Sequence, residues 1–183
     1  MVNPFSTRFW VAGVLPFQFP EHAETVGTLL EKSRQHTICQ IVGPHGSGKS
    51  TLLLELLKRY EESGANVRSL FFNDQHRKLP SDLTFQKDQI LFADGFEQLP
   101  LFHRLWLLFR STRLILTTHR PVRLIPILYR TQPQFAVFVQ IVRQLVSKAP
   151  DESALQAVYD CSGGNFRNAF FELYDQWEQP TPQ

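Results

Sequence analysis

One glycine-rich stretch constrains this chain more than any other feature. Residues 43–51 match the pattern G-x-x-x-x-G-K-[ST]. Gly43, Gly46 and Gly48 can adopt backbone angles that turn successive N–H groups toward one anion. A helix starting directly after them would add unpaired N–H groups and the positive end of its dipole, so the stretch predicts a cradle for a phosphate chain. The candidate contacts are Gly43, Pro44, His45, Gly46, Ser47, Gly48, Lys49, Ser50 and Thr51.

The flanking segments place this loop between a strand and a helix. Residues 37–42 form a short apolar and β-branched run, as expected for a buried parallel strand. Apolar residues then recur on one helical stripe as far as Tyr60, and Gly64 provides the expected stop. In this order of elements, Lys49 would reach the β- and γ-phosphates of a nucleotide, and the Ser50 hydroxyl would hold Mg²⁺.

A second apolar run ends in a carboxylate. Residues 89–94 predict a buried strand that finishes at Asp94. A carboxylate at the tip of a neighbouring strand can hold Mg²⁺ through its water shell, so Asp94 joins Ser50 as a candidate metal ligand. Residues 67–72 and 113–119 predict two more strands, the latter ending in polar side chains where the γ-phosphate would lie.

Four further helices and one undecided segment complete the predicted elements. A helix over residues 100–111 is expected to turn Leu101, Leu105, Leu108 and Phe109 inward. Residues 135–142 fit either a fifth strand or the start of a helix, and periodicity does not separate the two. The other predicted helices span residues 21–35, 152–161 and 165–177.

These elements predict one α/β domain with a small appendage. We expect a nucleotide-binding α/β domain over residues 1–148, beginning with an extended segment over 1–20, then a helical lid over 149–178 and a tail over 179–183. Within the first segment, Phe9 and Trp10 would either stack on a nucleotide base or cover an apolar edge of the domain.

Charge and cysteine content bear on the partners of the protein and on its cellular compartment. The net charge is only +2, yet no Asp or Glu lies between Leu99 and Pro150, where arginines are frequent. The two cysteines, Cys39 and Cys161, offer neither a disulfide framework nor metal-ligand spacing, and both are expected to be inert packing residues. No signal peptide or membrane span is predicted, so we expect a cytoplasmic protein without membrane contact.

Taken together, the chain resembles the P-loop NTPases of the additional-strand division, and within them the AAA+ ATPases. The resemblance rests on residues 43–51, the strand ending at Asp94, the polar strand end at Thr117 and Thr118, and the stretch Ser162 to Ala169. It implies a three-layer α/β/α fold with a central parallel sheet and a small C-terminal helical lid. It also implies ATP and Mg²⁺ as ligands.

The resemblance assigns roles to individual residues, with two departures. Thr118 matches the end of the first sensor strand, and Arg167 matches the lid arginine that reaches the γ-phosphate. Family members usually place the water-activating glutamate directly after the Mg²⁺ aspartate, but Gly95 stands there and the first glutamate is Glu97. Glu97 is either the displaced base or a favourable charge at a helix start. The expected catalytic set is Lys49, Asp94, Glu97, Thr118 and Arg167.

The second departure is that no arginine finger stands out, although Arg120, Arg123 and Arg130 lie where the family supplies one to a neighbouring subunit. Three functions remain open. The first is a Mg²⁺-dependent ATPase that moves its lid and acts on a macromolecular partner, DNA or protein, with a homo-oligomer possible. The second is a switch that binds ATP and hardly hydrolyses it. The third is a small-molecule kinase. ATP is preferred to GTP because no Asn-Lys-x-Asp pattern is present.

Overall fold

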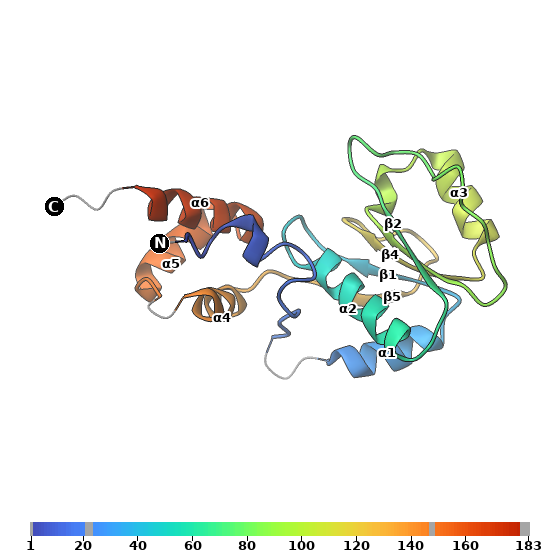
Figure 1. Ribbon diagram of the computed structural model, residues 1–183, viewed down its shortest axis with the longest axis horizontal. Helices are drawn as coiled ribbons and strands as arrows, with labels where there is room; N and C mark the ends of the chain where they lie inside the picture. The colour runs from blue at the N-terminus through green and yellow to red at the C-terminus, as the bar shows by residue number, and fades with distance from the viewer. Residues whose placement is uncertain (1, 21–23, 147–148, 180–183) are drawn as a thin grey trace.

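The computed structural model describes residues 2–20, 24–146 and 149–179, and Figure 1 shows its two parts. A sheet of five parallel strands has the order β2-β3-β4-β1-β5. The strands are β1 (Ile38–Val42), β2 (Val67–Phe71), β3 (Ile90–Asp94), β4 (Arg113–Thr118) and β5 (Ile127–Arg130). Strand β4 therefore lies between the loop strand β1 and the strand that ends at Asp94, as the additional-strand division requires.

Helices cover both faces of this sheet, which confirms the predicted three-layer arrangement. Helix α1 (Val26–Arg34) and helix α2 (Lys49–Glu62) lie on one face, which we call the α2 face, where α2 buries Leu52, Leu53 and Leu56 against the strands. Each such side chain stabilises the fold by about 1.5–3 kcal/mol. Helix α3 (Leu101–Arg110) covers the opposite face, which we call the α3 face, through Leu107 and Leu108.

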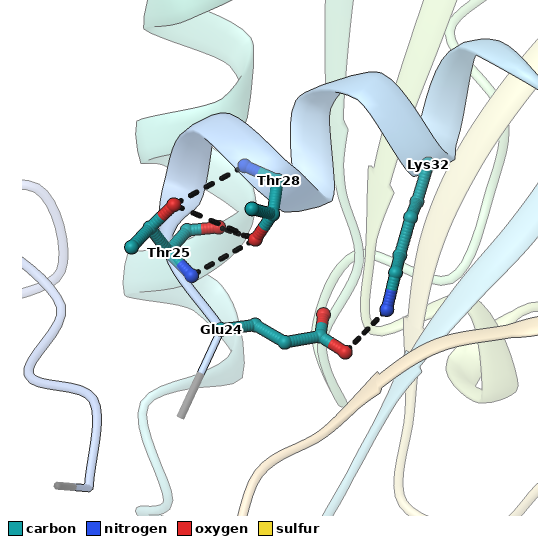
Figure 2. Close-up of polar contacts among 4 residues, drawn as sticks. All are labelled: Glu24, Thr25, Thr28 and Lys32. Atoms are coloured by element: carbon teal, nitrogen blue, oxygen red, sulfur yellow. Dashed lines mark hydrogen bonds and ion pairs between the residues drawn. The ribbon is translucent and has the colours of Figure 1, made fainter. Parts of the chain in front are cut away.

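Helix α1 begins with a capping box (Figure 2). The Thr28 N–H donates to the Thr25 hydroxyl at 3.2 Å, and the Thr25 N–H donates to the Thr28 hydroxyl at 2.9 Å. Two donors at the helix start are thereby satisfied. Glu24 and Lys32 form an ion pair beside them. The chain thus enters α1 at Thr25, within the predicted helix 21–35, of which residues 21–23 lie outside the described part.

The structure corrects the prediction for α3. Leu107 is fully buried, but Leu101, Leu105 and Phe109 are exposed on the outer side of the helix, where the sequence predicted three inward residues. Seven of the ten positions, all except His103, Arg104 and Arg110, are Leu, Phe or Trp. Apolar residues consequently occur nearly all round the helix, and the period alone does not identify the side that packs.

The structure decides between the two alternatives for residues 135–142. They belong to helix α4 (Phe135–Leu145), and the fifth strand is formed by residues 127–130, which pair with β1 in parallel. Helix α4 does not cover the sheet. Its residues Phe138, Val139 and Val142 share a buried cluster with α5 (Glu152–Cys161) and α6 (Phe166–Glu178). The three helices lie together beside the sheet domain in Figure 1, and we keep for them the name lid that was given to the predicted helical subdomain.

Helix α4 begins after Gln134 and packs with α5 and α6, although the sequence assigns residues 135–148 to the predicted α/β domain. Residue 148 and residues 180–183 of the predicted tail lie outside the described part. The N-terminal segment, with a 3-10 turn η1 (Thr7–Phe9), runs beside α6. The Asn3 side-chain amide donates to the Tyr174 carbonyl at 3.1 Å, and Phe5 is buried in the lid cluster. The segment predicted to be extended therefore ties the N-terminus to the lid.

The cysteines have opposite environments. Cys39 is buried in β1, as predicted, and burial raises the pKa of its thiol to about 12. Cys161 is exposed at the end of α5, so the prediction that it packs inside is wrong. None of the helices in the described ranges has the length and apolarity that crossing a bilayer requires.

Candidate nucleotide site

The glycine-rich loop leaves β1 at the carboxyl edge of the sheet and enters α2, as the sequence predicts. Gly46 and Gly48 have φ values of +70° and +86°, the left-handed region that glycine enters without strain. Gly43 leaves no room for a side chain, because an added Cβ would lie 2.0 Å from the Thr131 hydroxyl oxygen. That hydroxyl is within 2.6 Å of the Ser47 hydroxyl and holds the loop against the end of β5. The loop is thus preformed around its glycines.

Lys49 lies in the first turn of α2 with its ammonium folded back over the loop. It donates to the Pro44 carbonyl at 2.6 Å and is only 8% exposed. Burial lowers the pKa of Lys49 to about 8, the carboxylates of Glu97 and Asp94 raise it, and Arg167 lowers it. Three of these four side chains, those of Lys49, Asp94 and Arg167, line one cavity.

Asp94 ends β3 on the α2 face, next to Thr117 of β4. The Thr117 hydroxyl donates to Asp94 Oδ1 at 2.5 Å and accepts from the Gly95 N–H at 2.9 Å. Because side chains alternate along a strand, Thr118 points to the opposite face. There its hydroxyl donates to Gln40 Oε1 at 3.2 Å, inside the α3 face. Of the two threonines, Thr117 is therefore the one that contacts Asp94, and Thr118, the expected catalytic residue, points away from it.

Glu97 lies in a 3-10 turn, η2 (Phe96–Gln98), directly after Asp94 and Gly95. Gly95 has a φ of +71°, and an added Cβ would lie 2.3 Å from the Phe72 carbonyl oxygen. Glycine thus permits the sharp bend that turns the chain from β3 into η2. The bend brings Glu97 Oε1 into contact with Nδ1 of His119, a contact that is an ion pair only when the histidine is protonated, and close enough to Lys49 to raise its pKa.

His119 was not among the predicted site residues. Its ring lies against the ring of His45 from the loop, with centroids 3.6 Å apart. Burial and Lys49 lower the pKa of His119, Glu97 raises it, and His45 lowers it. The only sequence signal was its position after the polar end of β4, because its two partners are distant in sequence.

The lid reaches the loop through the start of α6. Asn165 caps this helix by accepting the Arg167 N–H at 3.0 Å, and a Cβ added to Gly46 would lie 1.9 Å from the same Asn165 oxygen. Gly46 therefore allows the lid to contact the loop. Arg167 lines the cavity between lid and loop, and its charge acts on Lys49. The structure thus brings Arg167 to the predicted side of the loop.

A cavity of about 800 Å³ opens between the loop, the lid and the N-terminal segment. Its polar lining includes Lys49, Ser50, Asp94 and Arg167. Its apolar lining comes mainly from the N-terminal segment and the lid. The apolar lining residues include Trp10, Val11, Pro16, Phe17, Ile141, Phe166 and Phe170.

Trp10 also packs on the lid, its ring stacked on Phe170 with centroids 5.2 Å apart, and its indole N–H donates to the Phe5 carbonyl. Of the two roles predicted for Trp10, the structure therefore shows the covering of an apolar surface. Trp10 also lines the cavity. Phe9 is not among the residues that line the cavity; the Arg8 guanidinium lies 4.6 Å from its ring centre.

Ser50 and Asp94 both line the cavity, and their oxygens fit the donor set of a Mg²⁺ ion bound chiefly by phosphates. The described residues contain no group of three or more His, Cys, Asp or Glu side chains that would hold a metal alone. The three finger candidates Arg120, Arg123 and Arg130 are exposed, and the structure shows no ion pair for them within its described ranges.

Comparisons with known proteins place this arrangement in a fold. No family model matches the sequence, and no curated protein matches it significantly. Solved structures do match. Domain III of the Thermotoga maritima replication initiation protein DnaA aligns with 98% of this chain and 99% of its own length, at 13% identity and a TM-score of 0.52. The chain has an AAA+-like fold.

Two further matches agree. The Aeropyrum pernix Orc1 protein, solved in complex with DNA, aligns with 92% of this chain at 13% identity and a TM-score of 0.56. A DNA replication initiation factor aligns with 81% at 15% identity and a TM-score of 0.52. The chain spans 64% and 57% of the lengths of these two proteins. At such identities the likeness concerns the fold.

Proposed function

We propose that the protein is a Mg²⁺-dependent ATPase that couples nucleotide state to lid position. The observation that carries the proposal is the meeting of Lys49, Asp94, Glu97 and Arg167 at the carboxyl edge of the sheet, beside a preformed anion loop. In open α/β sheets, ligands bind at this edge. The AAA+-like fold of the solved replication proteins supports the same reading.

The phosphate chain would bind to the N–H groups of residues 43–51 and to Lys49. In the structure the Lys49 ammonium has the Pro44 carbonyl as its partner. Binding would exchange that carbonyl for phosphate oxygens, which form stronger, charge-assisted hydrogen bonds. Ser50 and Asp94 would hold the Mg²⁺ ion, which supplies positive charge to the phosphate oxygens.

Glu97 is the residue we propose as the general base. A carboxylate in this role accepts a proton from the attacking water, so it must lie within hydrogen-bond reach of it. Here Glu97 is engaged by His119, and Thr117 fixes Asp94 through one short hydrogen bond. His119 would act as a positioning residue that orients the Glu97 carboxylate. Arg167 would stabilise charge on the γ-phosphate from the lid side, so that closure of the lid completes the site.

Phosphate release and isothermal calorimetry with Mg²⁺-ATP test this proposal. Lys49→Ala should lose ATP binding. Glu97→Gln should bind ATP as the wild type does and release phosphate at least about 100-fold more slowly, the usual contribution of a general base. Equal turnover of wild type and Glu97→Gln would show that Glu97 is not the base. Absence of nucleotide uptake at millimolar ATP would exclude the site itself.

A slow switch is the second candidate function, and the Glu97–His119 contact favours it. A glutamate held by a histidine is not free to activate water until that contact changes. This candidate predicts tight ATP binding with turnover near that of Glu97→Gln, and recovery of turnover in His119→Ala. A small-molecule kinase would instead form ADP only when an acceptor is present.

For the macromolecular partner we propose DNA first, because one matched protein was solved with DNA and the segment between Leu99 and Pro150 carries arginines without acids. The measurement is phosphate release with and without duplex DNA at two salt concentrations. Sedimentation with ATP tests the possible homo-oligomer. Substitution of Arg120, Arg123 or Arg130 by Ala would identify a finger by loss of turnover without loss of ATP binding.

A further inference from the structure

The outer side of α3 is apolar and uncovered. Leu101, Phe102, Leu105 and Phe109 are 67%, 75%, 45% and 84% exposed. Their spacing places all four within about one quarter to one third of the helix circumference, since each residue turns the helix by about 100°. They form one stripe, which we call the outer stripe. The stripe lies at the end of the molecule away from the lid (Figure 1).

A short loop extends this surface. Between β4 and β5, Leu124 is 93% exposed and has a φ of +70°, a conformation that costs a non-glycine residue about 1–2 kcal/mol. The buried Gln40 side chain holds the loop on both sides of it, donating to the carbonyls of Val122 at 2.9 Å and Ile125 at 2.6 Å. Leu124 is thus presented outward by a fixed loop.

A groove of about 570 Å³ separates this loop from α3. Leu105 and Phe109 line one wall, and Leu124 and Ile125 line the other. Exposed apolar surface of this kind, contiguous and on rigid elements, marks an interaction site in a protein of this size. A helix is the occupant that such a groove accommodates, through apolar residues spaced three and four apart.

Charge identifies the chemistry of the occupant. Arg123 and His36 line the groove, and no acidic side chain does so among the described residues. Arg123 belongs to the segment that lacks Asp and Glu, and its side chain is exposed. Surfaces with a basic border favour partners with the opposite charge, which steers association and rejects basic partners.

A second copy of this chain does not offer a matching helix in the described ranges. Helix α6 is acidic, but its exposed aromatic residues already have partners. Trp177 packs edge-on against Phe5, and Phe171 packs edge-on against Trp10, both from the N-terminal segment. The occupant that fits is therefore a different protein.

We propose that the outer stripe and Leu124 form a docking site for an acidic amphipathic helix of a partner protein. The groove opens where β1 and β5 begin, with residues 35–38 on its floor, whereas the phosphate loop follows the end of β1. Docking and nucleotide binding therefore use opposite edges of the sheet, and the site does not depend on the proposed ATPase activity.

The test uses two synthetic helical peptides of roughly 18 residues, long enough to form several turns. Both carry Leu at a spacing of three and four; one has Glu at the remaining positions and the other has Lys. Fluorescence anisotropy with the full chain should show the Glu peptide binding at least about tenfold more tightly than the Lys peptide. The double variant Phe102→Ser/Phe109→Ser should weaken the Glu peptide about tenfold or more.

Two further variants sharpen the result. Arg123→Glu should shift the preference toward the Lys peptide. Val14→Ser, which alters an exposed apolar residue outside both the groove and the nucleotide cavity, should leave both affinities unchanged. Circular dichroism establishes that each variant is folded.

Three results would overturn the proposal. The first is equal or absent binding of the two peptides. The second is self-association of the wild type that the double variant abolishes, which would make a second copy the occupant. The third is binding of a DNA duplex that weakens in the same double variant.

Discussion

At the carboxyl edge of the sheet the molecule buries polar groups, and on α3 it exposes apolar ones. Lys49, Ser47 and Thr117 are buried beside the phosphate loop. Phe102, Phe109 and Leu124 are in solvent at the far end. Both regions depart from the usual distribution, in which charged side chains face water and large apolar ones do not.

The buried polar groups and the exposed apolar groups differ in whether the fold supplies them with partners. The buried polar groups are paired: Lys49 with Pro44, Ser47 with Thr131, and Thr117 with Asp94. Among the described residues, nothing covers the exposed apolar groups in a comparable way. A paired buried group is ready for a ligand that replaces one partner, whereas an uncovered apolar stripe offers a surface to another macromolecule. The three polar groups are thus satisfied by the chain itself, and the outer stripe is not covered by it.

The sharpest test of this difference is Lys49→Met. Loss of the charge-assisted bonds to phosphate should weaken ATP binding at least about 100-fold. The nucleotide-free protein should become more stable by about 1 kcal/mol, after allowance for solvent screening, because folding lowers the pKa of Lys49 from 10.5 to about 8 and penalises its charged form.

Calorimetry measures the affinity, and urea unfolding measures the free energy of unfolding. The penalty is present in full below pH 8 and falls as the pH rises toward 10.5, so the stability gap between wild type and variant should narrow over that window. An unstable Lys49→Met protein would contradict the view that burial of the charge costs stability.

Two substitutions on α3 compare the stability contributions of its buried and its exposed side. Leu107→Ala removes a fully buried side chain of α3 and should cost about 3 kcal/mol. Phe109→Ser, two residues later but on the outer stripe, should change the free energy of unfolding by less than about 0.5 kcal/mol. Urea unfolding of both variants gives the comparison. Similar losses would mean that the stripe is part of the core.

Two glycines with positive φ allow the cost of backbone strain to be measured apart from the cost of a steric clash. Gly64→Ala should cost about 1 kcal/mol through its φ of +79° alone, since the space around it is open. Gly46→Ala has a similar φ but also clashes with Asn165, so it should cost about 2 kcal/mol and displace the lid start from the loop. Thermal unfolding measures both, and equal losses would show that the lid does not press on the loop.

The smallest expected effect is the difference in reactivity between the two cysteine thiols. Iodoacetamide at pH 8 should modify Cys161, which is exposed, and leave Cys39 unmodified, because burial raises its pKa to about 12 and excludes the reagent. Mass spectrometry of the tryptic peptides reads out both sites. Rapid modification of Cys39 would show that β1 opens readily.

Local patterns were enough to determine the nucleotide edge. Residues 43–51 bend as predicted because their glycines and the following helix are neighbours in sequence, and Asp94 ends its strand because an apolar run stops there. The strand, the loop and the first turn of α2 are one continuous segment of the chain. The start of the lid at Asn165 and Arg167 was readable for the same reason, as a capped helix after two glycines.

Tertiary packing decided the rest. Thr117 and not Thr118 meets Asp94, because the face of β4 that each takes depends on its neighbouring strands. Glu97 meets His119 only after two separate strand ends lie side by side. Helix α3 is apolar almost all round, so its sequence is compatible with several rotations. Only the sheet beneath it selects Leu107 for burial and leaves Phe109 outside, because a side chain is buried by what lies opposite it in space.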